Sequence, residues 1–189
     1  MQNFQYHLET FFEMYKREDI IELYNEPSVY FRLGNHLEHL FNVDYKIQFW
    51  RKPKFFGIQD KLVKSFIDIA VFGDEMDTLH AVEVVYIKDE PQLEKMFEIC
   101  TGLRFMEQMV EQGWQESYVL LIADIPKQHN GKPHYLFRGE TIIEGMMQKP
   151  RETQTVLELN GSYTVDWIEV DDHMHYAVIP IQVQQIETE

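Results

Sequence analysis

The order of three apolar runs around one helical pattern limits the fold of this chain more than any other feature. The runs KSFIDIAVFG and LHAVEVVYI are joined by the turn-forming GDEMDT, and SYVLLIADI follows a helical spacing between Pro91 and Gln112 that Gly113 ends. Runs of β-forming residues bounded by turn residues predict strands, and a continuous apolar run is typical of a strand covered on both faces. The sequence therefore predicts an α/β fold in which helices flank a central sheet.

The flanking segments predict further elements. The opening segment spaces its apolar residues for one or two amphipathic helices with a break near Arg17 to Asp19, and Asn25 with Pro27 just behind it indicates the start of another helix. YKIQFW alternates like a strand, and TIIEGMMQ fits one short helix. The segment 155–183 alternates around NG and DD, which predicts a hairpin or a three-stranded meander.

Composition narrows the class of protein. A chain of 189 residues with 44% hydrophobic and 14% aromatic residues is long enough for one folded domain with a substantial core. No apolar stretch is long enough to cross a bilayer, and MQNFQYHLETFF lacks the layout of a signal peptide, so we expect no membrane association and a cytoplasmic location. The single cysteine, Cys100, excludes an internal disulfide and a thiolate-cluster metal site.

Charge is distributed unevenly along the chain. The net charge is −15, yet the segment 45–64 has six basic residues against one acidic residue, a local net of +5. Lys46, Arg51, Lys52 and Lys54 alternate with aromatic residues there, so this segment is the predicted nucleic-acid-binding region. The same pattern is also typical of a solvated basic hairpin, and charge alone favours that alternative.

Two acids stand inside the apolar strand patterns. Asp68 interrupts SFIDIAVF, and Glu83 interrupts HAVEVV on the strand face that also has Ala81 and Val85. If these strands pair as a hairpin, the two carboxylates approach each other across one end of the sheet. Close, buried carboxylates repel and are costly to desolvate unless a cation lies between them. The pair therefore predicts a site for Mg²⁺ or Mn²⁺, which prefer oxygen ligands.

These motifs and their order resemble the restriction-endonuclease-like PD-(D/E)XK nuclease superfamily. GNHLEHLF is similar to the family's Gly-x-x-x-Glu helix, FIDIAVFGD to its second-strand acid motif and HAVEVV to its third-strand motif. The resemblance implies that Asp68 and Glu83 hold the metal and that Glu38 is an auxiliary catalytic acid. It also implies a mixed central sheet flanked by helices, with a C-terminal β-hairpin or meander.

The length predicts one domain, 1–189, in which three parts can be distinguished. A nuclease-like core spans 25–125, an N-terminal helical segment spans 1–24, and a C-terminal β-rich extension spans 126–189.

The third-strand motif departs from the family at Val85, where a lysine is expected to orient the attacking water and stabilise charge at the phosphate. Lys88 has the wrong parity for that face of the strand, whereas Lys95, at the start of the next helix, could reach back. Arg104 lies about two turns farther along the helix. Lys95 is therefore the predicted catalytic lysine.

Two functions are consistent with these residues. The first is a metal-dependent DNA phosphodiesterase, an endonuclease or an exonuclease, which the three acids favour. The second is a catalytically inactive nuclease-fold module that binds a protein partner, which Val85 and the acidic surface favour.

Overall fold

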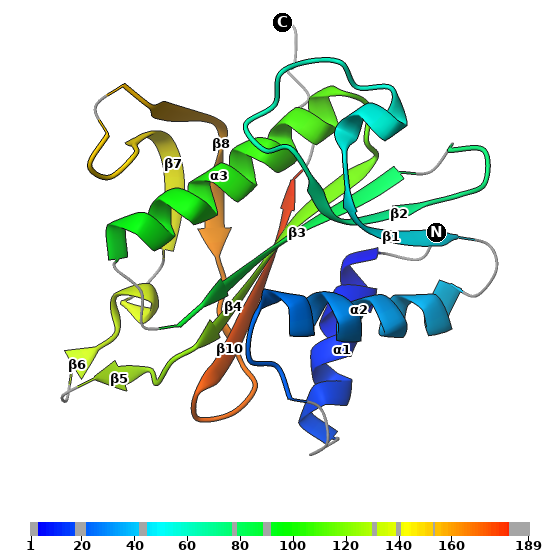
Figure 1. The fold of residues 1–189 in the computed structure, drawn as a ribbon. Helices are drawn as coiled ribbons and strands as arrows, with labels where there is room; N and C mark the ends of the chain where they lie inside the picture. Colours follow the sequence, from blue (N-terminus) through cyan, green and yellow to red (C-terminus); the bar gives the residue numbers. More distant parts are fainter. Residues whose placement is uncertain are drawn as a thin grey trace, which may run out of the picture.

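The structure is a computed structural model, and it describes residues 4–17, 22–41, 45–76, 79–88, 92–129, 132–138, 141–152 and 154–181. Figure 1 shows a twisted central sheet with two helices on one face and a long helix on the other. The three α-helices of the described residues are α1 (Phe4–Arg17), α2 (Glu26–Phe41) and α3 (Gln92–Glu111).

Six strands of the described residues form the central sheet in the order β1-β2-β3-β4-β10-β9. The first three strands are an antiparallel meander, β4 is parallel to β3, and β10 is antiparallel to both β4 and β9. The parallel pair requires a crossover connection, which α3 supplies. The strands are β1 (Lys46–Arg51), β2 (Ile67–Phe72), β3 (Leu79–Ile87), β4 (Glu116–Asp124), β9 (Ile168–Glu169) and β10 (Met174–Ile181).

The two faces of the sheet have separate hydrophobic cores. On one face α1 and α2 pack against alternate residues of the central strands, among them Val82, Val84 and Leu120. On the other face α3 packs against the residues of opposite parity, including Ala81, Val85 and Leu121. Because side chains alternate across a strand, strands buried on both faces need apolar residues at almost every position. This explains the continuous apolar runs in the sequence.

A hairpin of β7 (Thr141–Gln148) and β8 (Val156–Val165) packs beside α3, and shorter elements precede it. TIIEGMMQ is therefore β7, and the predicted helix is wrong. Gly145 has a φ of 74° at an irregularity in the β7–β8 pairing, a conformation that a helix does not contain. The shorter elements are β5 (Gln128–His129), β6 (Lys132–Pro133) and the 3₁₀ helices η2 (Pro53–Phe56) and η3 (Tyr135–Phe137).

The NG sequence also differs from its prediction as a turn, because β8 runs straight through Asn160 and Gly161. A buried carboxylate, Glu107 of α3, accepts hydrogen bonds from both backbone nitrogens at 2.8 Å and from the Tyr163 hydroxyl at 2.7 Å. Its other oxygen lies 3.0 Å from Arg104 Nη1. Glu107 therefore ties this strand to the helix.

We expect Glu107→Ala to lower the free energy of unfolding by about 2–3 kcal/mol, because it leaves the Asn160 and Gly161 nitrogens and the Tyr163 hydroxyl, all partly buried, without this acceptor. Glu111→Ala is a matched control: Glu111 also contacts Arg104 and Asn160, but its side chain is 46% exposed against 5% for Glu107. Glu111→Ala should lower the free energy of unfolding, measured in urea, by less than about 1 kcal/mol. Equal losses for the two variants would contradict this role of Glu107.

The main elements of the predicted core are present in the predicted order. Asn25 starts α2, and its side chain accepts a hydrogen bond from the Ser28 nitrogen at 2.9 Å. Gly113 follows α3 with a φ of 91°. The helix break near Arg17 to Asp19 coincides with the end of α1 at Arg17, and residues 18–21 lie outside the described residues. The C-terminal segment contributes more than an extension, because β10 is a full strand of the central sheet.

Candidate functional site

The candidate site lies where β2 and β3 separate. Their pairing runs from Phe72 and Leu79 to Ile69 and Val82 and then stops. Beyond that point the Val84 nitrogen donates to Asp68 Oδ2 at 3.0 Å instead of to a backbone carbonyl of β2. The Asp68 carboxylate thereby satisfies a buried backbone donor and is held in a fixed position at the opening of the sheet.

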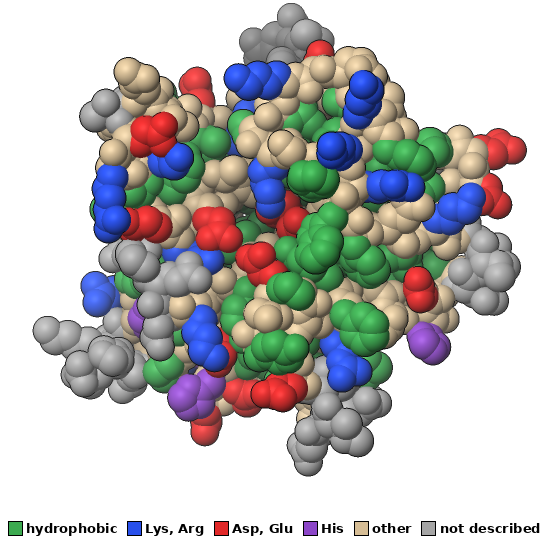
Figure 2. All heavy atoms as spheres, in the orientation of Figure 1, with side chains coloured by type: hydrophobic (Ala, Val, Ile, Leu, Met, Phe, Trp, Pro, Cys, Tyr) green, Lys and Arg blue, Asp and Glu red, His purple; other side chains and the backbone are tan. Residues whose placement is uncertain are grey.

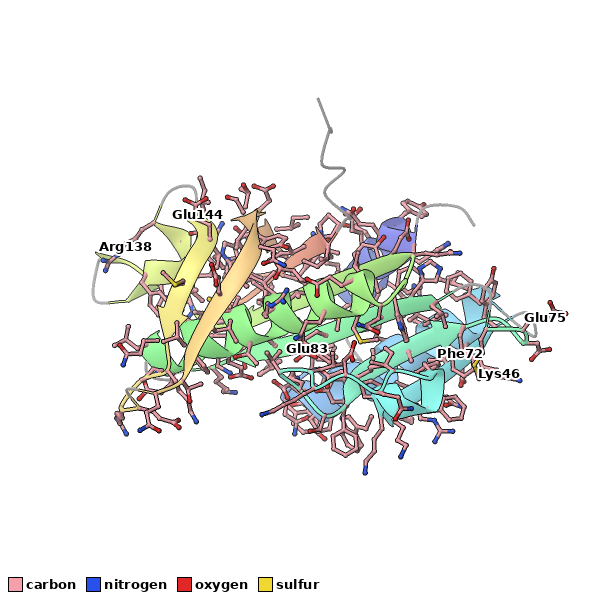
Figure 3. All side chains as sticks on the ribbon, turned by 90° about the horizontal axis from the view of Figure 1, so that it is seen from above. Lys46, Phe72, Glu75, Glu83, Arg138 and Glu144 are labelled. Carbon is pink, nitrogen blue, oxygen red and sulfur yellow. The ribbon has the colours of Figure 1, made fainter. Side chains whose placement is uncertain are left out.

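Asp68 and Glu83 occupy the same face of the sheet, as their alternation predicts. Both project to the α3 side, and Glu83 lies next to α3 near the centre of the molecule in Figure 3. A Cβ added at Gly102 of α3 would come within 3.0 Å of Glu83 Cγ, so a glycine allows the helix to cover this acid closely. The structure therefore brings the two predicted metal ligands together under α3.

Lys64 lies between these two acids. Its ammonium forms a short ion pair with Glu83 Oε1 and lies 3.8 Å from Asp68 Oδ1. The side chain of Lys64 is 31% exposed, whereas those of Asp68 and Glu83 are 7% and 3% exposed. Lys64 comes from the connector between η2 and β2, immediately before the strand that carries Asp68. The cluster thus contains a lysine, but this lysine comes from position 64 and not from the motif position, which Val85 occupies.

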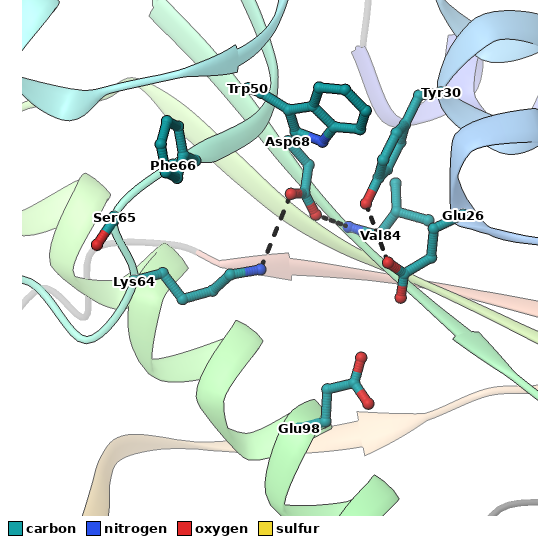
Figure 4. A pocket seen from close by; sticks show the side chains of 9 residues that line it. All are labelled: Glu26, Tyr30, Trp50, Lys64, Ser65, Phe66, Asp68, Val84 and Glu98. Atoms are coloured by element: carbon teal, nitrogen blue, oxygen red, sulfur yellow. Dashed lines mark hydrogen bonds and ion pairs between the residues drawn. The ribbon is translucent and has the colours of Figure 1, made fainter.

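A pocket of about 500 Å³ opens beside this cluster. Figure 4 shows the carboxylates of Glu26, Asp68 and Glu98 facing the same space as the Lys64 ammonium. The Tyr30 hydroxyl donates to Glu26 Oε2 at 3.2 Å, which connects α2 to the acidic wall. The pocket is lined by Glu26, Tyr30, Trp50, Lys64, Ser65, Phe66, Asp68, Val84 and Glu98.

The acids of this cluster are only partly neutralised. Burial raises the pKa of Glu83 well above its ordinary value, and Asp68 adds to the shift. Burial likewise raises the pKa of Asp68, against the opposing charge of Lys64. Burial alone would lower the pKa of Lys64, but the charges of Glu83 and Asp68 outweigh it and raise that pKa. A further cation or proton would therefore stabilise this group.

Glu26, and not Glu38, lines the pocket beside this cluster. Glu38 is exposed on the C-terminal half of α2, about 18 Å along the helix from Glu26 at 1.5 Å per residue. Glu26 stands in the first turn of α2, and its Oε1 accepts from the Tyr86 nitrogen at 3.3 Å. Burial raises the pKa of Glu26, and the negative charges of Glu98 and Asp68 add to the shift.

The basic candidates on β3 and α3 have other partners. Lys95 is buried, where it donates to the Tyr86 carbonyl at 3.0 Å and pairs with Glu98 Oε2 at 2.6 Å. It supports the wall of the pocket from behind and does not line it. Lys88 pairs with Asp124 at 2.9 Å, and Arg104 pairs with Glu107 and Glu111. Val85 is buried in the core under α3.

The four predicted nucleic-acid contacts are divided between the two ends of β1. Lys46 pairs with Asp74 at 2.6 Å beside Phe72, away from Glu83 in Figure 3. Arg51 stands at the other end, where its guanidinium lies 4.0 Å from the centroid of the Phe55 ring. Lys52 and Lys54 border a second groove next to the acidic pocket. The structure therefore places two of the four residues, Lys52 and Lys54, in the groove that adjoins the pocket.

Asp68 and Glu83 offer carboxylate oxygens, the ligand type that hard divalent cations prefer, but the described residues contain no group of three or more His, Cys, Asp or Glu side chains arranged as a metal site. Glu83 Oε2 is buried and has no hydrogen-bond partner among the described residues. Mg²⁺ requires few protein carboxylates, because it keeps several waters. An ion shared by Asp68 and Glu83 requires the Lys64 ammonium to move aside, which its partial exposure permits.

Sequence reasoning missed Lys64 and Glu26. Lys64 precedes Asp68 by four residues in the basic segment, and Glu26 stands beside the predicted helix start at Asn25. Lys64 is the first residue of the predicted strand run KSFIDIAVFG, and Glu26 lies outside the strand runs, so no periodic pattern linked either residue to the two acids.

Comparisons with protein-family models, with curated proteins and with solved structures give no match. Within the described ranges, none of the helices has the length and apolar character needed to cross a membrane.

Proposed function

We propose that this chain is a metal-dependent phosphodiesterase that cleaves nucleic acid and has a restriction-endonuclease-like fold. The observation that carries the proposal is the convergence of Asp68, Glu83 and Lys64 where β2 and β3 separate. The arrangement of α2, the meander β1-β2-β3, the crossover α3 and the parallel strand β4 is consistent with the element order of the nuclease family that the sequence resembles.

Each group in the cluster has a role in this proposal. Asp68 and Glu83 would hold Mg²⁺ or Mn²⁺, which supplies Lewis acidity toward the scissile phosphate. The Lys64 ammonium, displaced toward the pocket, donates hydrogen bonds to the phosphate and stabilises the charge that develops in the transition state. Glu26, with its raised pKa, accepts a proton from the attacking water.

The test is cleavage of supercoiled plasmid and of labelled linear DNA and RNA with Mg²⁺ or Mn²⁺. We expect products that depend on the cation and disappear with a chelator. Circular and end-labelled substrates separate endonuclease from exonuclease activity. Asp68→Asn controls for contaminating nucleases, because its amide oxygen still accepts from the Val84 nitrogen while the charge is lost.

Two results would overturn the proposal. Equal cleavage by Asp68→Asn would remove this site from the reaction. Absence of cleavage on every substrate, together with no heat of Mg²⁺ or Mn²⁺ binding in calorimetry, would favour the inactive module that binds a protein partner.

A further inference from the structure

A second, basic groove adjoins the acidic pocket. It has a volume of about 350 Å³ and shares Lys64 and Ser65 with the pocket. Lys52, Lys54 and Lys61 also line it. In Figure 2 basic side chains gather over the segment between β1 and β2, directly above acidic side chains that surround a hollow. The groove therefore leads from a positively charged surface into the proposed catalytic site.

The single acid in the lining of the groove does not cancel this charge. Asp60 Oδ2 accepts a hydrogen bond from Gln112 Nε2 at 2.8 Å, so its carboxylate is directed toward the end of α3. The chain as a whole has a net charge of −15. A groove lined by four lysines on such an acidic protein favours a polyanion, because the lysines attract phosphates that the acidic surface would repel.

Aromatic rings stand exposed where the groove meets the pocket. Trp50 is 55% exposed and Phe66 is 43% exposed, and both line the acidic pocket. The Lys52 ammonium lies 5.5 Å from the centroid of the Phe66 ring. Exposed rings beside lysines can stack on bases while the lysines contact the adjacent phosphates.

The backbone at Trp50 indicates that this ring is placed for binding. Trp50 has a φ of 49°, in the left-handed region that bulky residues rarely adopt. Trp50 is skipped in the β1–β2 pairing, which resumes at Arg51 opposite Ile67, and the Tyr30 ring meets the Trp50 ring edge-on with centroids 5.7 Å apart. Strain of this kind concentrates at ligand-binding sites, where the surrounding structure maintains it.

From this geometry we infer that the substrate class is single-stranded nucleic acid. Its bases stack on Trp50 and Phe66, and its phosphates follow Lys52, Lys54 and Lys61 toward Asp68 and Glu83. A duplex keeps its bases paired and presents phosphates outward, so rings at the mouth of a pocket cannot reach a base face. The inference rests on the proposed function and specifies its substrate.

The experiment measures equilibrium binding of the full chain to fluorescein-labelled oligonucleotides in EDTA, so that cleavage does not interfere. We expect the single strand to bind at least about 10-fold more tightly than a duplex of the same sequence. Trp50→Ala and Phe66→Ala should each weaken single-strand binding by about 5- to 100-fold, since stacking contributes about 1–3 kcal/mol per base. Each of Lys52→Gln and Lys54→Gln should lower the slope of log affinity against log salt by about 0.7.

Matched controls separate binding from folding. Phe31→Ala removes a ring that is 61% exposed on α2, and Lys127→Gln removes a lysine that pairs with Glu169, so neither should change the affinity. Trp50→Phe keeps a stacking ring and should recover most of the affinity lost in Trp50→Ala.

The outcomes distinguish this inference from the proposed function. Duplex binding as tight as single-strand binding, or no effect of Trp50→Ala, overturns the inference. The proposed function stands in either case if cation-dependent cleavage is present in the wild type and lost in Asp68→Asn. If cleavage does not depend on the cation and on Asp68 while single-strand binding is intact, the proposed function is overturned instead.

Discussion

Replacing Lys64 with methionine is expected to lower the rate of phosphodiester cleavage by about 100- to 1,000-fold, the usual effect of removing one donor that stabilises transition-state charge. Lys64 Nζ contacts Glu83 and lies 3.8 Å from Asp68 Oδ1, and no other described lysine or arginine lines the acidic pocket. Methionine has a similar length and no charge. The rate is measured on single-stranded and duplex substrates under single-turnover conditions.

A second measurement separates catalysis from structure. Lys64→Met removes a cation that competes for the acids, so Mn²⁺ binding in calorimetry should stay at the wild-type affinity or become tighter while cleavage is lost. Lys88→Met, which changes an exposed lysine paired with Asp124, should leave both quantities unchanged. A wild-type rate in Lys64→Met, together with a large loss in Lys95→Met, would return the catalytic role to the lysine that the sequence predicts.

The acids of the site could be predicted because strand geometry determines their position. Asp68 and Glu83 each interrupt an apolar run, and a short connection makes the two strands antiparallel neighbours. Alternation then assigns both carboxylates to one face. The same reasoning gave α3 and β4, because a long helical period and a continuous apolar run are strong signals.

The positions of Lys64 and Glu26 could not be predicted, because no periodic hydrophobic pattern determines where their side chains point. Lys64 comes from the connector that follows η2, and the path of such a connector is set by tertiary contacts such as the bond from the Val63 nitrogen to Gln108 at 2.9 Å. The helix pattern of α2 contains both Glu26 and Glu38, and only the packing of α2 on the sheet determines which acid reaches the opening. The helix predicted for TIIEGMMQ is wrong because a bulge at Gly145 breaks the alternation that would have indicated a strand, although the partner strand β8 follows directly in the hairpin.

Glu83→Gln is expected to reduce cleavage to background while it stabilises the fold at neutral and alkaline pH. The loss of activity follows from removing one of two proposed metal ligands. The gain in stability follows from burial, which raises the pKa of Glu83 and makes its charged form costly. Each unit by which the folded-state pKa is raised corresponds to about 1.4 kcal/mol of destabilisation once the group is ionised.

The sign of this effect fixes its pH dependence. A carboxyl group whose pKa is raised in the folded state favours folding at pH values below its ordinary pKa of 4.5. This contribution to stability is lost as the pH rises through the folded-state pKa. The wild type should therefore lose stability over that range in urea unfolding, and Glu83→Gln should lose less. The slope will not vanish, because burial also raises the pKa values of Asp68 and Glu26.

Divalent cations provide the decisive comparison. If Glu83 is a ligand, Mg²⁺ or Mn²⁺ should raise the midpoint of thermal unfolding of the wild type far more than that of Glu83→Gln, because a ligand stabilises only the state that binds it. The stabilities of the two proteins should then converge as the cation concentration increases. If the cation instead stabilises both proteins equally, Glu83 is not a ligand, and its burial beside Lys64 serves the fold alone. A buried acid that weakens the metal-free protein and is compensated by a cation is the behaviour expected of a binding site, since a purely structural ion pair would gain nothing from the metal.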